Sequence, residues 1–121
     1  MEWGGNVARV PDILYQGQPG TTDTDLYTVP SGYKATITGI LATNTNTDAK
    51  HFSLHLVQNG DLVANDVVIV KMKTIYGTDS GGDEWKFEFP IPLNTVGDKI
   101  SGIQETAECI TVTIIGFVEA V

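Results

Sequence analysis

Two histidines, His51 and His55, stand four residues apart, and imidazole is a common metal ligand and proton carrier near neutral pH. On a helix this spacing puts both rings on one face, where they can bind one ion. However, Phe52, Leu54 and Leu56 alternate with polar residues here, which predicts a strand with the two histidines roughly 13 Å apart on the solvent side. We expect no metal site within one chain, and a ligand role only where symmetry brings copies together.

Residues 79–84 form a second candidate for chemistry, because they combine three carboxylates with two glycines. Carboxylates on a flexible loop are typical ligands of Ca²⁺. Counted from Asp79, the calcium-binding loop of helix–loop–helix proteins needs glycine sixth and glutamate twelfth, but the chain has Glu84 and Pro90 there. We therefore predict a solvated hairpin connection, in which Asp79 and Asp83 are possible partner contacts, and no metal site.

The nucleophilic side chains lack the neighbours that would activate them. Cys109 lies in a β-patterned segment with no histidine or asparagine motif, so we expect it to be a buried structural cysteine. None of the serines Ser31, Ser53, Ser80 and Ser101 has the GxSxG pattern of a nucleophile elbow. We predict no catalytic residue and no cofactor, and expect that the chain is not an enzyme.

Aromatic side chains beside turns are the remaining candidates for ligand binding, because an aromatic ring can stack on a sugar. Tyr33 and Tyr76 stand next to predicted turns, so we expect them at the surface. Trp85 falls in the apolar phase of a predicted strand, which favours the core. One hypothesis is therefore a glycan-binding module that uses the two tyrosines together with Asn and Asp side chains.

Composition excludes other partners. Fifteen acidic and seven basic residues give a formal net charge of -8, which opposes binding to the phosphates of nucleic acid. The most apolar stretches, residues 67–70 and 110–118, are shorter than the roughly 20 residues that span a bilayer, so we expect no membrane partner. One cysteine and no secretion signal after Met1 predict folding in a reducing cytoplasm.

Apolar residues recur with a period of two wherever the pattern is clear, which predicts strands. In the clearest run four apolar side chains alternate with polar residues or proline and are expected to face inward: Trp85, Phe87, Phe89 and Ile91. Pro90 has no N–H for a sheet ladder, so this strand is placed at a sheet edge. In residues 68–73 we expect Val68, Val70 and Met72 to face inward. Lys71 and Lys73 then lie on the solvent face, where lysines discourage pairing at a possible sheet edge.

Residues 33–45 and 108–118 are long segments rich in Thr, Ile and Val, which suit a pleated sheet. Each contains a glycine, Gly39 or Gly116, at which the alternation shifts phase, as a β-bulge requires. With shorter candidates at residues 12–15, 26–29 and 99–103, the total is about eight strands. Closely spaced turn signals and the lack of a helical period predict an all-β, antiparallel sandwich or barrel.

The first twenty residues differ from the rest, because glycine, proline and apolar residues are mixed there without a period. We divide the chain into an extended N-terminal arm, residues 1–20, and a β-sandwich domain, residues 21–121. Two interpretations stay open: the arm lies on a neighbouring subunit, or it covers the sheet of its own domain. For the first, the predicted contact residues are Trp3, Val7, Val10 and Ile13.

The order of several short segments carries a resemblance. These are ILYQGQPGTT at residues 13–22, LYTVPSGYKATI at 26–37, ATNT at 42–45, GDKI at 97–100 and ITVTIIG at 110–116. Together they resemble a pattern in small virion proteins of tailed phages, in which an LYTVP-[AS]-G strand and turn leads into a Thr-rich strand and a GDxI turn precedes the last strand. The resemblance covers most of residues 13–118, and its motifs are scaffold features, since Pro30 and Gly97 fit turns.

The resemblance implies a jelly-roll-like β-sandwich and a small homo-oligomer, with a trimer favoured. Our first hypothesis is a non-enzymatic virion protein, a capsid decoration (cement) protein on the outer head surface, assembled in the host cytoplasm. Its partners would be the major capsid protein or other virion proteins, and its acidity suits a surface that avoids packaged DNA. The alternative is a tail or fibre accessory module that binds host glycans.

Overall fold

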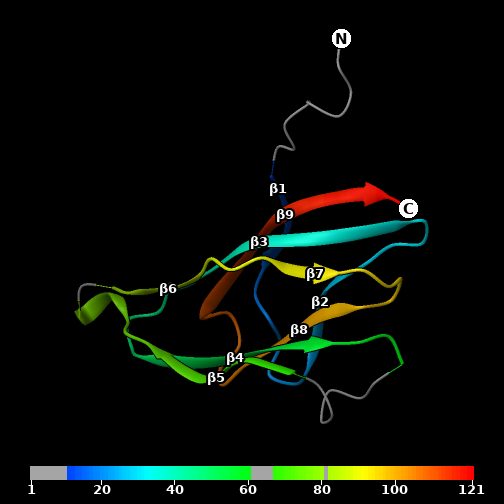
Figure 1. The fold of residues 1–121 in the computed structure, drawn as a ribbon. Coiled ribbons are helices and arrows are strands. Elements are labelled where there is room, and N and C mark those ends of the chain that lie inside the picture. The colour runs from blue at the N-terminus through cyan, green and yellow to red at the C-terminus, as the bar shows by residue number, and fades with distance from the viewer. Residues whose placement is uncertain (1–10, 61–66, 81) are drawn as a thin grey trace.

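The computed structural model describes residues 11–60, 67–80 and 82–121, which fold into two antiparallel sheets packed against each other (Figure 1). The β-sandwich prediction is confirmed. Nine strands are found in these residues, where about eight were expected, because the run around residues 85–91 forms two. In chain order the strands are β1 (Asp12–Gly17), β2 (Thr24–Thr28), β3 (Tyr33–Asn44), β4 (Lys50–Val57), β5 (Val67–Ile75), β6 (Glu84–Phe87), β7 (Ile91–Leu93), β8 (Lys99–Gln104) and β9 (Ile110–Ala120).

The strand order is that of a jelly roll. The first sheet has the order β1-β9-β3-β6, with β7 also paired to β3, and the second sheet has the order β2-β8-β4-β5. The pairs β1 with β9, β2 with β8, β3 with β6 and β7, and β4 with β5 are nested like the two arms of one long hairpin. Such a hairpin, folded over into two sheets, is a jelly roll, so the expected architecture is confirmed.

The hydrophobic core lies between the sheets and consists mainly of branched aliphatic side chains, which pack well on a pleated surface. Cys109 is 2% exposed, which confirms the prediction of a buried cysteine. Trp85 is half-buried and packs its ring edge-on against Phe52. Both sheets contribute large, fully buried side chains. The first sheet supplies Ile37, Leu93, Ile110 and Ile114, and the second supplies Phe52, Leu54, Ile75 and Ile100.

Gly39 of β3 and Gly116 of β9 are needed for different structural reasons. The register of β3 on β9 shifts between Ile37 and Gly39, so the bulge predicted at Gly39 is confirmed. At Gly116, an added Cβ would lie 2.2 Å from the carbonyl oxygen of Thr36, so the close approach of β3 requires glycine there.

A bulge in β5 overturns the prediction that Met72 faces the core. The register on β4 shifts between Phe52 and Leu54, so that an additional β5 residue faces Ser53. Met72 has a left-handed φ of 50° and is 58% exposed. Val68, also expected to face inward, is 46% exposed, and a second register shift separates it from Val70. Its backbone N–H donates to the hydroxyl of Ser53 at 2.8 Å, and Ser53, expected on the solvent side, is buried. The alternation of residues 68–73 cannot continue through this bulge. β5 is nevertheless an edge strand, as the lysines indicated.

Phe89 is the second correction. It was expected to face inward, but it is 72% exposed, because the strand is interrupted between β6 and β7. Pro90 lies in this interruption and has no N–H with which to continue the ladder on β3. The edge position predicted from Pro90 is confirmed, since β6 ends the strand order of the first sheet.

The N-terminal segment is described from Pro11 onward, and residues 1–10 lie outside the described residues. Residues 12–17 form β1, which pairs with β9 at the edge of the first sheet. Residues 12–17 of the predicted arm are therefore part of the first sheet. No helix within the described ranges is long and apolar enough to cross a membrane.

Candidate functional site

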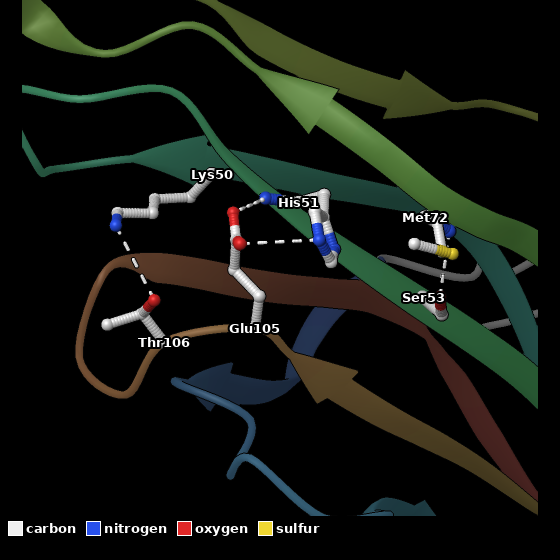
Figure 2. Close-up of polar contacts among 6 residues, drawn as sticks. All are labelled: Lys50, His51, Ser53, Met72, Glu105 and Thr106. Atoms are coloured by element: carbon white, nitrogen blue, oxygen red, sulfur yellow. Dashed lines mark hydrogen bonds and ion pairs between the residues drawn. The ribbon is translucent and has the colours of Figure 1, made fainter.

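His51 binds the side chain of Glu105 on the second sheet, as Figure 2 shows. The imidazole Nε2 lies 3.3 Å from Oε2 of Glu105, and the backbone N–H of His51 donates to Oε1 at 2.9 Å. In return, the backbone N–H of Glu105 donates to the carbonyl oxygen of His51 at 3.1 Å. Both side chains are about one-third exposed. These contacts fasten the loop after β8 to the start of β4.

A shallow groove of about 300 Å³ lies beside this pair, with Ser53, Met72 and Ile103 among its lining residues. The hydroxyl of Ser53 already accepts the N–H of Met72, so it is held as part of the β5 bulge. Within the described part of the chain, no three His, Cys, Asp or Glu side chains gather as a metal site would require. The arrangement around His51 supports a structural role.

The predicted loop contacts do not form one site. Tyr33 begins β3, whose twelve residues span about 35 Å. At the far end, Asn44 donates to the carbonyl oxygen of Ile75, next to Tyr76. The two tyrosines are 44% and 58% exposed, as expected, but they lie at opposite ends of the sandwich. One chain therefore has no shared platform on which both could stack on one sugar.

Asp79 and Asp83 lie at the Tyr76 end. Asp79 belongs to the helical turn η3 (Thr78–Ser80), whose backbone is held by the β3–β4 loop. The N–H of Thr78 donates to the carbonyl oxygen of Asn46 at 3.0 Å. Both carboxylates are exposed, as the prediction of a solvated connection requires. Two tyrosines away from this loop have a shifted pKa. Burial raises the pKa of Tyr15 and of Tyr27, because their rings pack against the core.

Residues of the segments 26–37 and 42–45 hold the loops together. Asn44 is 5% exposed; its Nδ2 donates to the carbonyl oxygens of Asp48 and Ile75, and its Oδ1 accepts the N–H of Asn46. Gly32 has a φ of 84°, as the turn after Pro30 requires.

Asp98 of the GDKI segment ties its own β7–β8 turn to two further loops. The carboxylate of Asp98 accepts the backbone N–H of Asn59 at 2.9 Å and that of Thr95 at 3.2 Å. Its carbonyl oxygen accepts the N–H of Val29, the residue after β2. The turns after β2, β4 and β7 are thus joined at one end of the sandwich, which is a scaffold role.

An apolar groove crosses the outer face of the first sheet and has a volume of about 380 Å³. Its lining includes Leu41 of β3 and Ile115 of β9, with Pro11 at the start of the described chain. Lys86 of β6 and Glu88 add two charged side chains to its rim. Ile13, a predicted contact residue, pairs with Ile115 and is 55% exposed, so it lies beside this groove. The other predicted contacts, Trp3, Val7 and Val10, lie outside the described residues.

A second apolar surface, which we call the open side, lies between the outer edges of β5 and β6. It is the side with Trp85, Phe87 and Phe89, whose rings follow one another at centroid distances of 6.0 Å and 5.8 Å. The first two rings are half-buried, and Phe89 is exposed. Sequence reasoning missed this surface, because alternation alone placed Phe89 in the core. The adjacent Pro90 was the signal that the strand breaks there.

Comparison with protein families and with curated proteins assigns no family to the chain. No protein-family model matches it. No curated protein matches it either. The interpretation of its function therefore depends on its own residues and fold.

Proposed function

We propose that this chain is a non-enzymatic structural protein of a tailed-phage virion, which decorates the outer surface of the capsid. The motifs at residues 13–22, 26–37, 42–45, 97–100 and 110–116 resemble those of small phage virion proteins. The jelly roll suits this role, because such double-sheet folds recur in viral capsid domains and present rigid outer faces. Fold alone does not assign a function, so the proposal also needs a docking surface.

One observation carries the proposal: residues of the phage-like motifs close the loops of the jelly roll. Asn44 ties the β3–β4 loop to the end of β5, and Asp98 ties the turns after β2, β4 and β7. The sequence resemblance and the fold therefore describe the same scaffold. This scaffold supports a protein that acts through its surfaces.

We assign capsid docking to the outer face of the first sheet. Its groove is apolar at Leu41 and Ile115, and the exposed Ile13 extends it toward β1. Residues 1–10, with Trp3, Val7 and Val10, connect to the chain at Pro11, which itself lines the groove. Apolar side chains from this segment and this face can then contribute to one contact with the capsid. On a symmetric shell many weak contacts of this kind act together.

The test is co-sedimentation with capsid shells assembled from the major capsid protein of the phage to which this proposal assigns the chain. The intact chain should sediment with the shells, and both deletion of residues 1–10 and Ile13→Asp should reduce binding at least tenfold. Deletion up to residue 10 leaves β1 and its pairing with β9 in place. The matched control is Val121→Asp, which changes an exposed apolar residue away from the groove. Equal binding by all four proteins would contradict the docking face.

The glycan-binding alternative now rests on the Tyr76 end alone, since Tyr33 lies at the other end of the sandwich. Tyr76, Asp79 and Asp83 are exposed there and could contact a sugar. A glycan array separates the two proposals. Binding that Tyr76→Ala abolishes, together with no binding to shells, would replace capsid decoration by glycan recognition.

A further inference from the structure

The end of β9 extends beyond its described pairing with β1. β1 pairs with β9 as far as Asp12, which lies opposite Gly116. β9 itself continues to Ala120 and keeps β3 beside it along this length (Figure 1). The register of an antiparallel pair fixes which residues face each other when the pairing continues. The sequence before Pro11 can therefore be matched to the end of β9 residue by residue.

The proline at position 11 is compatible with such a continuation. The backbone N–H of Ile13 donates to the carboxylate of Asp12 at 2.8 Å, so it is not used in the ladder with β9. The direction of the hydrogen-bonding groups alternates along a strand, so position 11 has the same orientation as position 13. The proline nitrogen, which carries no hydrogen, then points away from β9 and removes no bond from the ladder. This orientation suits the edge position of β1 in the first sheet.

The apolar side chains match in this register. Continued beyond Asp12, it gives three pairs, which are Val10 with Val118, Arg9 with Glu119 and Ala8 with Ala120. The first pair lies on the core side of the sheet, because Val118 also lies opposite the buried Ala35 of β3. Val118 is 37% exposed, so a valine beside it would cover apolar surface.

The middle pair joins opposite charges. Arg9 is the one arginine of the sequence, and it falls opposite a glutamate. Lys34 lies opposite Glu119 on β3, so the row across the sheet reads lysine, glutamate, arginine. Cross-strand pairs of opposite charge stabilise a sheet. A shift of the register by one residue would instead turn Arg9 toward the core side. Charge and apolar contact therefore select the same register.

We propose that residues 8–10 of this chain bind the end of β9, residues 118–120, as a continuation of β1. The pairing lies within one chain, because Asp12 is already held on the same β9 and only Pro11 separates it from Val10. No loop has to be closed for the three additional pairs to form. The inference rests on register, charge and apolar contact, and it does not depend on the virion assignment.

The pairing divides the predicted arm contacts between two roles. Val10 faces the core side of the sheet and stabilises the end of the sandwich. Arg9 lies on the outer face, where Ile13 is exposed, and so adds a positive charge to the proposed docking face. Trp3 and Val7 are then the apolar residues before Pro11 that are left for contact with the capsid.

Amide hydrogen exchange, followed by NMR on the full chain, tests the register. The N–H groups of Ala8 and Val10 point toward β9 in this pairing and should exchange at least about tenfold more slowly than in the unfolded chain. The N–H of Arg9 points away from β9 and should exchange fast. Slow exchange at alternate residues is specific to an added strand. Equal protection at all three positions, whether strong or weak, would overturn the proposal.

Cleavage by an arginine-specific protease gives a second readout, because the sequence offers it a site only after Arg9. The intact chain should lose residues 1–9 slowly. Glu119→Lys should raise the cleavage rate about fivefold, since it sets like charges opposite each other and favours opening of the pair. Glu108→Lys is the matched control, because it makes the same charge change at an exposed position before β9 and should leave the rate unchanged. Equal rates for the intact chain and Glu119→Lys would overturn the pairing of Arg9 with Glu119.

Protein concentration separates pairing within one chain from exchange between copies. The cleavage rate should not change on dilution, because both partners of the pairing belong to the same molecule. A rate that rises on dilution would show that the segment binds β9 of another copy, and it would overturn the intramolecular pairing. Circular dichroism checks that each variant keeps its sheet structure.

Discussion

Replacement of Asn44 by alanine tests whether the motif residues hold the loops of the jelly roll. Asn44 makes three hydrogen bonds: to the carbonyl oxygens of Asp48 at 2.8 Å and Ile75 at 2.9 Å, and from the N–H of Asn46 at 2.8 Å. Each such bond contributes about 1 kcal/mol net, and the carbonyl of Ile75 loses its partner in a buried position. We expect Asn44→Ala to lower the free energy of unfolding by about 3 to 4 kcal/mol.

Urea denaturation followed by Trp85 fluorescence measures this loss. Asn94→Ala is the control, because Asn94 is exposed, and it should change stability by less than about 0.5 kcal/mol. Asn44→Asp keeps the shape but points a carboxylate at two carbonyl oxygens, which favours its protonated form and raises its pKa. Its stability should therefore be greatest below about pH 4, the unfolded pKa of aspartate, and be lost as pH rises. A loss below about 1 kcal/mol for Asn44→Ala would refute this role.

Three further changes have definite expected outcomes in thermal or urea denaturation. Gly116→Ala should lower the free energy of unfolding by about 3 kcal/mol, because the added Cβ would collide with the carbonyl oxygen of Thr36 on β3. Gly39→Ala should lower it by less than about 1 kcal/mol, because the nearest atom to the added Cβ lies at an ordinary 3.7 Å. Equal losses for the two variants would contradict the close approach at Gly116. Ser101→Ala should stabilise by about 1 kcal/mol, since this buried hydroxyl has no partner among the described residues; a large loss would reveal an unrecognised bond. Glu105→Gln should cost less than about 1 kcal/mol, because its ion pair with His51 is one-third exposed; a loss of several kcal/mol would show a stronger tie.

Local sequence patterns predicted the fold well where the strand pairing is regular. The sandwich, the buried Cys109 and the bulge at Gly39 all follow from alternation and from the preference of Thr, Ile and Val for sheets. The order of the sheets does not follow from alternation, because a period of two says which side chains face inward and not which strands pair. The jelly-roll order came from the motif resemblance, and the nested pairs confirm it.

Alternation failed where the strand itself is bulged or interrupted. Met72 faces solvent because an additional β5 residue lies opposite Ser53, and nothing in the residues 68–73 marks that bulge. Phe89 is exposed because β6 ends before Pro90, so the open side was hidden by the assumption of one continuous strand. Surfaces made by several strands, such as the groove beside Ile13, depend on this register and could not be predicted from one segment.

Quantitative mass spectrometry of purified particles tests most directly the proposed role of the chain as a component of the phage head. The proposal requires a tailed phage whose genome encodes this chain, and its purified particles are separated into heads and tails before digestion. Peptides of the chain should be found in the head fraction, in many copies per particle and in fixed ratio to the major capsid protein. Their absence from purified particles, or their presence in the tail fraction alone, would contradict the proposed role.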